Sequence, residues 1–207
     1  ASDVYKRQIR KWNKTYMFNR GNYYKQYRYG WYCICSKILG YSECNLIQVP
    51  IYMQFKLVLN DTFDKYNCGE FDKKESDTIS VSKSNFSHET DEVNVMISDT
   101  YPLSLSQLPE VKKNLPTLLI SRNNTNDVNR YDSPELVRCV VNEVRSLNNN
   151  IKKVNVYATT NPLNTKNIAS SAFKLGGRDN FNEVRVFQQE RDGIRKFNNN
   201  GIVVYKK

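Results

Sequence analysis

The chain has 207 residues, of which 39% are hydrophobic and 25% are charged, and its formal net charge at pH 7 is +10. This composition is that of a folded domain with its own hydrophobic core, and it excludes a disordered or collagen-like chain. No run of about 18 consecutive apolar residues occurs, so the sequence predicts no membrane-spanning helix and no membrane partner.

The chain begins with residues that we set apart from the fold. Asp3 to Gln8 reads as the translation of a transposon-end adapter used to prepare sequencing libraries. We therefore interpret residues 1–8 as a sequencing artefact. We expect the chain to be a fragment that lacks an upstream effector domain.

The segment from Ile9 to Tyr32 interleaves six basic residues with nine aromatic ones. Basic groups neutralise phosphates and flat rings stack on bases, which is typical of single-strand nucleic-acid binding. The same aromatic residues would also suit the core of a strand-rich fold. Both interpretations are open at this point.

Strands are predicted in the rest of the first half. Apolar residues occupy every second position from Ile47 to Leu59, which predicts one long half-buried strand with Pro50 near its start. A shorter strand is expected at Ile79 to Val81. We assign residues 9–90 to a strand-rich N-terminal lobe, which would be part of a first lobe.

From residue 91 the periodicity changes to that of an α/β lobe, which we place at 91–207. Ser133 and Pro134 predict the start of a helix that ends near Leu147. A second helix is expected at 165–175. Strands are expected at 93–97, 116–121, 153–158, 183–187 and 202–205. Alternation of strand and helix predicts a parallel sheet with flanking helices.

Several kinds of chemistry lack support in the sequence. The single histidine, His88, has no nucleophile or acid beside it in a recognisable pattern, and no phosphate-binding glycine motif occurs. The carboxylates of Glu70, Asp72, Glu75 and Asp77 fit a solvated loop better than a cation site. The five cysteines have neither disulfide nor zinc spacing, and they predict reduced thiols in a cytoplasmic protein. We expect no cofactor, no metal and no catalysis by this chain.

The predicted binding site lies at the carboxyl ends of the parallel strands, where open α/β sheets place their ligands. Three polar loops reach this edge and supply our candidate ligand-binding residues. They are Thr100, Tyr101, Ser121, Arg122, Asn123, Thr159, Thr160, Asn161, Thr165 and Lys166. Among them, Arg122 and Lys166 are the expected phosphate contacts.

The order of elements resembles a known family. Val154 to Pro162, a helix that closes on Leu175, and Val184 to Phe187 together resemble the C-terminal half of SAVED domains. Residues 91–102 resemble the strand and loop that open that half, and residues 57–63 resemble a stretch of the first half. The resemblance implies CARF-like, Rossmann-like lobes that bind a cyclic oligonucleotide in bacterial antiviral (CBASS) defence. It also implies ligand-induced self-association and activation of an attached or associated effector.

Two alternatives stay open from the sequence. A capsid protein of a small single-stranded DNA virus would explain the basic aromatic front and the alternating segment, but not the capped helix after Ser133. A small transferase or other α/β enzyme is the third interpretation, and no catalytic site for it is recognisable.

Overall fold

The computed structural model describes residues 2–14, 16–21, 26–74, 76–87, 90–123, 130–175, 181–190 and 195–207. Glu75 and His88, for which the sequence favours no catalytic or metal-binding role, lie outside these residues. The helices are α1 (Ser2–Asn13), α2 (Tyr29–Cys33), α3 (Ile51–Leu59), α4 (Pro134–Arg145) and α5 (Pro162–Ile168). π-Helical turns η1 (Ile34–Ile38) and η4 (Ala169–Leu175) extend α2 and α5, and η2 (Leu105–Gln107) and η3 (Glu110–Lys112) are short 3-10 turns.

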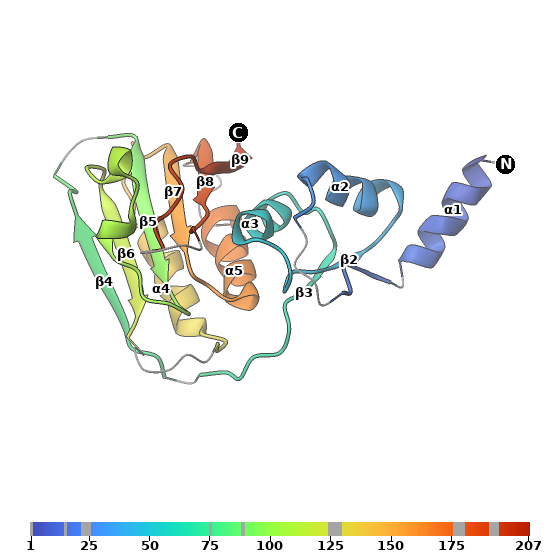
Figure 1. Ribbon diagram of the computed structural model, residues 1–207, viewed down its shortest axis with the longest axis horizontal. Coiled ribbons are helices and arrows are strands. Elements are labelled where there is room, and N and C mark those ends of the chain that lie inside the picture. Colours follow the sequence, from blue (N-terminus) through green and yellow to red (C-terminus); the bar gives the residue numbers. More distant parts are fainter. Residues whose placement is uncertain are drawn as a thin grey trace.

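The larger of two sheets forms the α/β half of the molecule (Figure 1). Its strands are β4 (Ile79–Ser84), β5 (Glu92–Ser98), β6 (Thr117–Arg122), β7 (Lys153–Ala158), β8 (Glu183–Phe187) and β9 (Ile202–Lys206), and their spatial order is β4-β6-β5-β7-β8-β9. The four central strands are parallel, whereas β4 and β9 pair antiparallel at the two edges. The predicted α/β class with a parallel sheet is confirmed.

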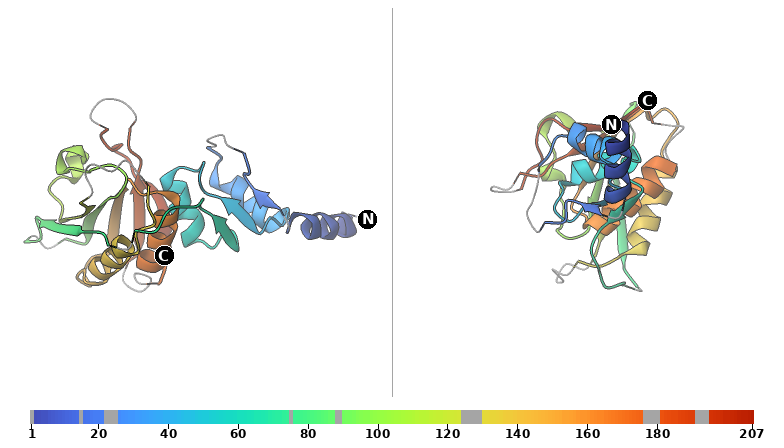
Figure 2. Two further views of the ribbon diagram at one scale, coloured as in Figure 1. Left: turned by 90° about the horizontal axis from the view of Figure 1, so that it is seen from below. Right: turned by 90° about the vertical axis from the view of Figure 1, so that its right-hand side faces the viewer.

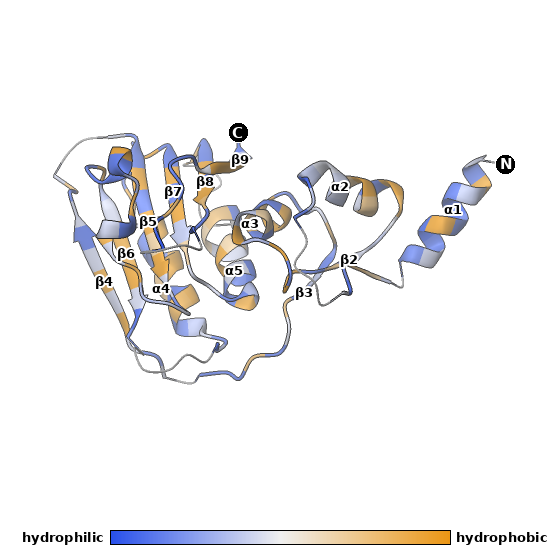
Figure 3. Cartoon of the chain, in the orientation of Figure 1, coloured by the Kyte–Doolittle hydropathy of each residue, from blue (hydrophilic) through white to orange (hydrophobic). Residues whose placement is uncertain are grey.

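Helices α4 and α5 cover one face of this sheet because each presents an apolar stripe to it. The hydroxyl of Ser133 accepts a hydrogen bond from the amide of Leu136, and Pro134 occupies the first helical turn, so α4 begins where the sequence predicts. Val95 and Ile97 of β5 point into the core below these helices. Met96 points to the other face, which buries a second cluster beneath the connection from β5 to β6. Figure 3 shows the orange apolar stretches along the central strands.

The predicted strand over residues 47–59 is wrong, since residues 51–59 form helix α3. Pro50 precedes the first turn, which is a favoured place for proline because it has no N–H to donate. The helix is enclosed by α5, η4, β8 and β9, so apolar residues are tolerated around most of its circumference. Phe55, for example, packs edge to face on Phe173 with ring centroids 5.9 Å apart. A helix buried on several sides loses its 3.6-residue period, and the alternation therefore suggested a strand.

The remaining N-terminal elements form a small parallel sheet, β1 (Met17–Phe18), β2 (Glu43–Asn45) and β3 (Lys65–Asn67), beside α2. Phe18 packs against several aromatic rings here, including that of the fully buried Tyr32. Trp12 on α1 is instead 76% exposed. Some aromatic residues of the 9–32 segment are therefore core and others lie on the surface. Figures 1 and 2 show α1 at the end of the molecule furthest from β4.

One continuous core joins the two halves, because buried residues of α2 and α3 belong to the same cluster as those of β5 and β9. A side chain of α3 and that of its C-cap residue also cover the edge of β9. The amide of Asn60 donates to the carbonyl of Val204 at 3.1 Å, and the ammonium of Lys56 lies 3.4 Å from the carbonyl of Val203. The division of the chain at residue 90 remains our proposal.

Candidate ligand-binding site

The connections of the parallel strands create a crevice between β5 and β7. The chain leaves β5 for β6 on one side and then returns through α4 to β7 on the other side. Such a reversal of strand order opens a crevice at the carboxyl ends, where α/β sheets bind ligands. A cleft of about 220 Å³ lies there, and the segments that follow β5 and β7 line it with Thr100, Tyr101, Thr159, Thr160 and Asn161.

Other parts of the chain complete the walls of this cleft. Ile47, Ile51 and Gln54 come from the N-terminal half, at and before the start of α3. Phe187, Gln188 and Gln189 come from the end of β8 and the residues after it. Arg130, Ala158 and Pro162 are the remaining lining residues. The cleft is thus shared by both halves of the molecule.

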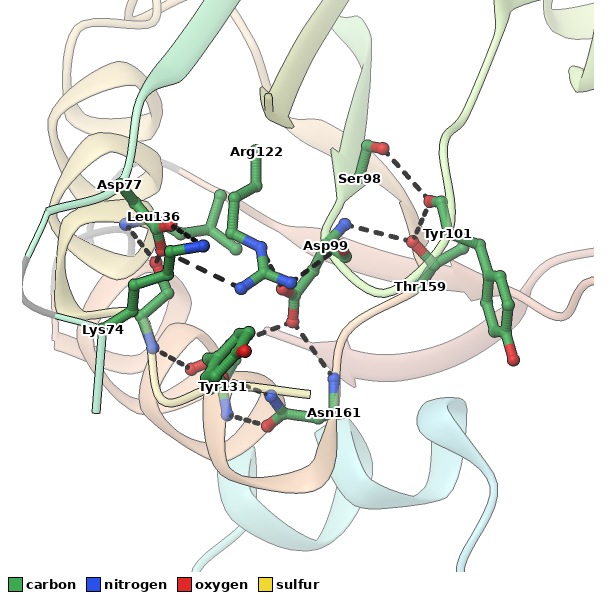
Figure 4. A network of polar contacts seen from close by, with 12 residues as sticks. Lys74, Asp77, Ser98, Asp99, Tyr101, Arg122, Tyr131, Leu136, Thr159 and Asn161 are labelled. Carbon is green, nitrogen blue, oxygen red and sulfur yellow. Dashed lines mark hydrogen bonds and ion pairs between the residues drawn. The ribbon is translucent and has the colours of Figure 1, made fainter. Parts of the chain in front are cut away.

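A buried ion pair underlies the loop that follows β7. The Nε atom of Arg122 lies 3.1 Å from the Oδ1 atom of Asp99, and each side chain is 1% exposed. The second carboxyl oxygen of Asp99 accepts hydrogen bonds from the backbone N–H of Asn161 at 3.3 Å and from the amide of Asn164 at 2.9 Å. Figure 4 shows Arg122 and Asn161 on opposite sides of Asp99. The pair therefore fixes the backbone at Asn161.

Protonation of Asp99 is set by these same neighbours. Burial raises the pKa of the Asp99 carboxyl above its ordinary value. The hydrogen bond from Asn164 and the charge of Arg122 favour the ionised form and offset part of that rise. The guanidinium of Arg122 also lies 5.5 Å from the ring centroid of Tyr131, so an aromatic face covers it. The network is buried, and it supports the loop that follows β7.

Thr159 ties the two lining loops together. Its hydroxyl donates to the carbonyl of Tyr101 at 2.8 Å and accepts from the backbone N–H of Asp99 at 3.2 Å. The N–H of Thr100 in turn donates to the carbonyl of Thr159 at 3.1 Å. The Tyr101 ring points away from this network (Figure 4), and the guanidinium of Arg195 lies 4.6 Å from its centroid. The loop positions are fixed, and an aromatic ring with an arginine lies at the rim.

Half of the sequence-predicted site residues line the cleft. Thr100, Tyr101, Thr159, Thr160 and Asn161 do so. Ser121, Arg122, Asn123, Thr165 and Lys166 are not among the described lining residues.

The other five have different surroundings. The carbonyl of Ser121 and the side chain of Asn123 accept hydrogen bonds from Ser80 on the edge strand β4. The buried hydroxyl of Thr165 bonds to that of Thr160 at 2.6 Å. Lys166 is half-buried. Burial raises the pKa of the Cys68 thiol, and the positive charge of Lys166 offsets part of that rise. Arg122, expected to contact phosphate, is instead held by Asp99 in the structure.

Three lining residues that the sequence did not single out carry unpaired amide atoms. These are the Oε1 atoms of Gln54 and Gln188 and the Nε2 atom of Gln189, each buried and without a hydrogen-bond partner among the described residues. A buried polar atom without a partner is costly, and in a cleft it indicates a place for a ligand or water. The signal for Gln54 was its position as an uncharged polar residue within an apolar run.

The thiols of Cys35 and Cys68 are buried. Burial raises the pKa of the Cys35 and Cys68 thiols to about 11, so both are protonated at neutral pH. No cluster of three or more metal-binding side chains occurs among the described residues.

A comparison with known protein families identifies the family of this chain. The model of the SMODS- and Ubiquitin system-associated 2TM effector domain matches residues 4–204. The chain belongs to this family. No curated protein sequence matches it significantly. Within the described ranges of this family member, no helix has the length and apolar character needed to cross a membrane.

Solved structures identify the fold of this family member. It is similar to Cap4, a SAVED/CARF-domain receptor of Acinetobacter baumannii, in a complex with the cyclic trinucleotide 3'3'3'-cAAA. The TM-score is 0.56 at 10% identity over 81% of this chain and 40% of that one. The complex of the same receptor with 2'3'3'-cAAA gives 0.54 at 11% identity over 75% and 36%. The chain thus spans less than half the length of these receptors, and the resemblance to SAVED domains is confirmed as a shared fold.

Proposed function

We propose that this chain is the sensor part of an antiviral effector, and that it binds a cyclic oligonucleotide in the cleft between β5 and β7. The observation that carries the proposal is the composition of that cleft. It combines an exposed cation, Arg130, an aromatic ring, Tyr101, and three unpaired amide atoms at a strand-order reversal. In this proposal Arg130 is the partner of a phosphate, the Tyr101 ring is the partner of a base, and the amide atoms are partners of polar groups on the nucleotide.

The comparisons support this assignment in two ways. Receptors of the same fold have been solved with cyclic trinucleotides, and the family description names an effector domain. We propose that ligand binding controls such an effector and that the chain itself performs no turnover. The five cysteines are free, which suits the reducing cytoplasm, where we propose that the protein acts.

The fold argues against the capsid alternative. A capsid jelly roll is built from antiparallel strands, whereas the four central strands of the main sheet are parallel and helices cover one face. An α/β enzyme would need a positioned nucleophile, base or metal, and the described side chains of the cleft supply no such set.

Titration calorimetry with a panel of cyclic di-, tri- and tetranucleotides tests the proposal. We expect at least one ring to bind, with linear oligonucleotides of the same sequence as matched ligands that bind more weakly. A correctly folded sample, verified by circular dichroism, that binds no member of the panel would contradict the proposed function.

A further inference from the structure

The orientation of the Gln54 side chain is fixed by the chain around it. Its Nε2 atom donates to the carbonyl of Val49 at 2.7 Å and to that of Leu46 at 3.1 Å. Reversing the amide would set its oxygen against two carbonyl oxygens, which is unfavourable, so Oε1 and Nε2 are assigned by the structure. Gln54 therefore presents an acceptor, and not a donor, on its remaining side.

That acceptor is buried and unpaired. Gln54 is only 3% exposed, it lines the cleft, and its Oε1 atom has no hydrogen-bond partner among the described residues. A carbonyl oxygen in this position requires a donor to recover the hydrogen bonds that it made to water in the unfolded chain. A phosphate group at neutral pH offers mainly acceptors, so it is a poor partner for Gln54.

The surroundings of Gln54 favour a flat ring over a sugar. Ile47 and Ile51 line the same cleft as Gln54, and Phe187 contributes a further apolar surface. A nucleobase can pack on such surfaces while its polar edge reaches an acceptor. Adenine, cytosine and guanine each carry an exocyclic amine that donates, whereas uracil carries carbonyl oxygens in place of an amine.

We propose that Gln54 is a specificity-determining residue, whose Oε1 atom accepts a hydrogen bond from the exocyclic amine of a nucleobase in the ligand. This inference rests on the proposed function and narrows its ligand class to rings with at least one amine-bearing base. It also gives the N-terminal half a direct part in recognition, because Gln54 belongs to α3 while the loops that follow β5 and β7 come from the α/β half.

The experiment compares cyclic triadenylate with three altered rings on the unmodified chain. One ring carries purine in place of adenine and lacks the amine, one lacks the 2'-hydroxyl groups, and one carries uracil. We expect loss of the amine to weaken binding about tenfold, as for a buried acceptor left without its donor. Loss of the 2'-hydroxyl groups should have a smaller effect. This arm requires no variant of the protein.

The variant Gln54→Met completes a double-mutant cycle. It keeps the length of the side chain but removes the whole amide, both the Oε1 acceptor and the Nε2 donor to Val49 and Leu46. Cyclic triadenylate and the purine ring should then bind this variant with equal affinity. Gln26→Met is the matched control, because Gln26 is exposed and lies outside the described lining of the cleft. It should retain the full preference for adenine. Circular dichroism establishes that both variants are folded.

The outcomes separate this inference from the proposed function. Equal binding of the adenine and purine rings by the unmodified chain overturns the inference, as does tightest binding of the uracil ring. An undiminished preference for adenine in Gln54→Met also overturns it, since the amine would then contact another group. In each case the chain still binds a cyclic oligonucleotide. Failure of every ring overturns the proposed function together with the inference.

Discussion

The Nε atom of Arg122 lies 3.1 Å from the Oδ1 atom of Asp99, and neither side chain is more than 1% exposed. This pair joins the end of β6 to the loop after β5, and Asp99 then holds the backbone of Asn161 after β7. Three neighbouring strands are thereby connected below the cleft. The role of Arg122 is to position the loops, which leaves its charge satisfied inside the protein.

Arg122→Met should therefore lower the free energy of unfolding by about 3–5 kcal/mol, because the Asp99 carboxylate would stay buried without its cation. Adding Asp99→Asn should recover part of the loss. The matched control is Arg138→Met on α4, where the arginine side chain is 69% exposed and pairs with Glu135 at the surface. That change should cost less than about 1 kcal/mol. Urea unfolding measures all three, and equal losses at positions 122 and 138 would refute the assigned role.

Arg130→Ala should weaken binding of the cyclic oligonucleotide about tenfold. Arg130 is an exposed cation that lines the cleft. The loss of one hydrogen bond between a charged side chain and a phosphate lowers affinity by about that factor. The loss should shrink as salt concentration rises. Lys166→Ala is the comparison, because the sequence favours Lys166 as a phosphate contact while the structure places it outside the described cleft lining. Calorimetry that shows a loss for Lys166→Ala alone would return the site to the sequence-based prediction.

Ionisation of Glu92 should make the free energy of unfolding depend on pH. Burial opposes its ionisation, but hydrogen bonds from Lys112 at 2.5 Å and Asn155 at 2.8 Å, with the charge of Lys112, outweigh burial and lower the pKa of Glu92 below its ordinary value of 4.5. The resulting stabilisation is present above that value and is lost as the pH falls through the lowered, folded-state pKa.

Glu92→Gln should then cost about 1 kcal/mol at pH 7, and the difference from the unmodified chain should vanish in strong acid. Glu110→Gln is the control, because Glu110 pairs with Lys113 at the surface and should contribute little. Urea midpoints measured from pH 7 to pH 3 give the comparison. A difference that stays constant across this range would show that ionisation of Glu92 is not responsible.

Gly201→Ala should destabilise the protein by about 1–3 kcal/mol, as expected for overpacking. A Cβ atom at position 201 would lie 2.5 Å from the ring of Phe187, which stacks on Tyr157 with centroids 4.5 Å apart and lines the cleft. The ring must shift, so ligand affinity should fall as well. Gly30→Ala on α2 has nothing within 4 Å of its new Cβ and should be neutral or stabilising. Thermal unfolding of the two variants tests this contrast.

Ligand-dependent assembly is the expected output of binding, because a ligand acts through its different affinities for two states. Light scattering should show a mass increase when a cyclic oligonucleotide that binds is added. Chromatography of the same sample should show the ligand intact. Cleavage of the ring that is lost on substitution of one residue of this chain would mean that the protein is also an enzyme.

The sequence by itself determined the α/β half. Local signals suffice there: Ser133 and Pro134 set the start of α4, and apolar runs such as 153–158 are long enough to be buried strands. The parallel order then placed Thr100, Thr159 and Asn161 at one edge, where the structure has its cleft. This part of the site follows from topology, because the carboxyl ends of parallel strands lie at the same edge of the sheet.

Only the tertiary structure decided the rest. Whether residues 51–59 form a helix depends on the elements that enclose them, since burial on several sides removes the amphipathic period. Whether Arg122 meets a ligand or Asp99 depends on a contact across two strands that no spacing encodes. Gln54 joins the cleft through the packing of α3 against α5, which brings a residue far from the loops in sequence to their side. Contacts between segments that are distant in the sequence fix the positions of these side chains. Local sequence patterns cannot predict such contacts.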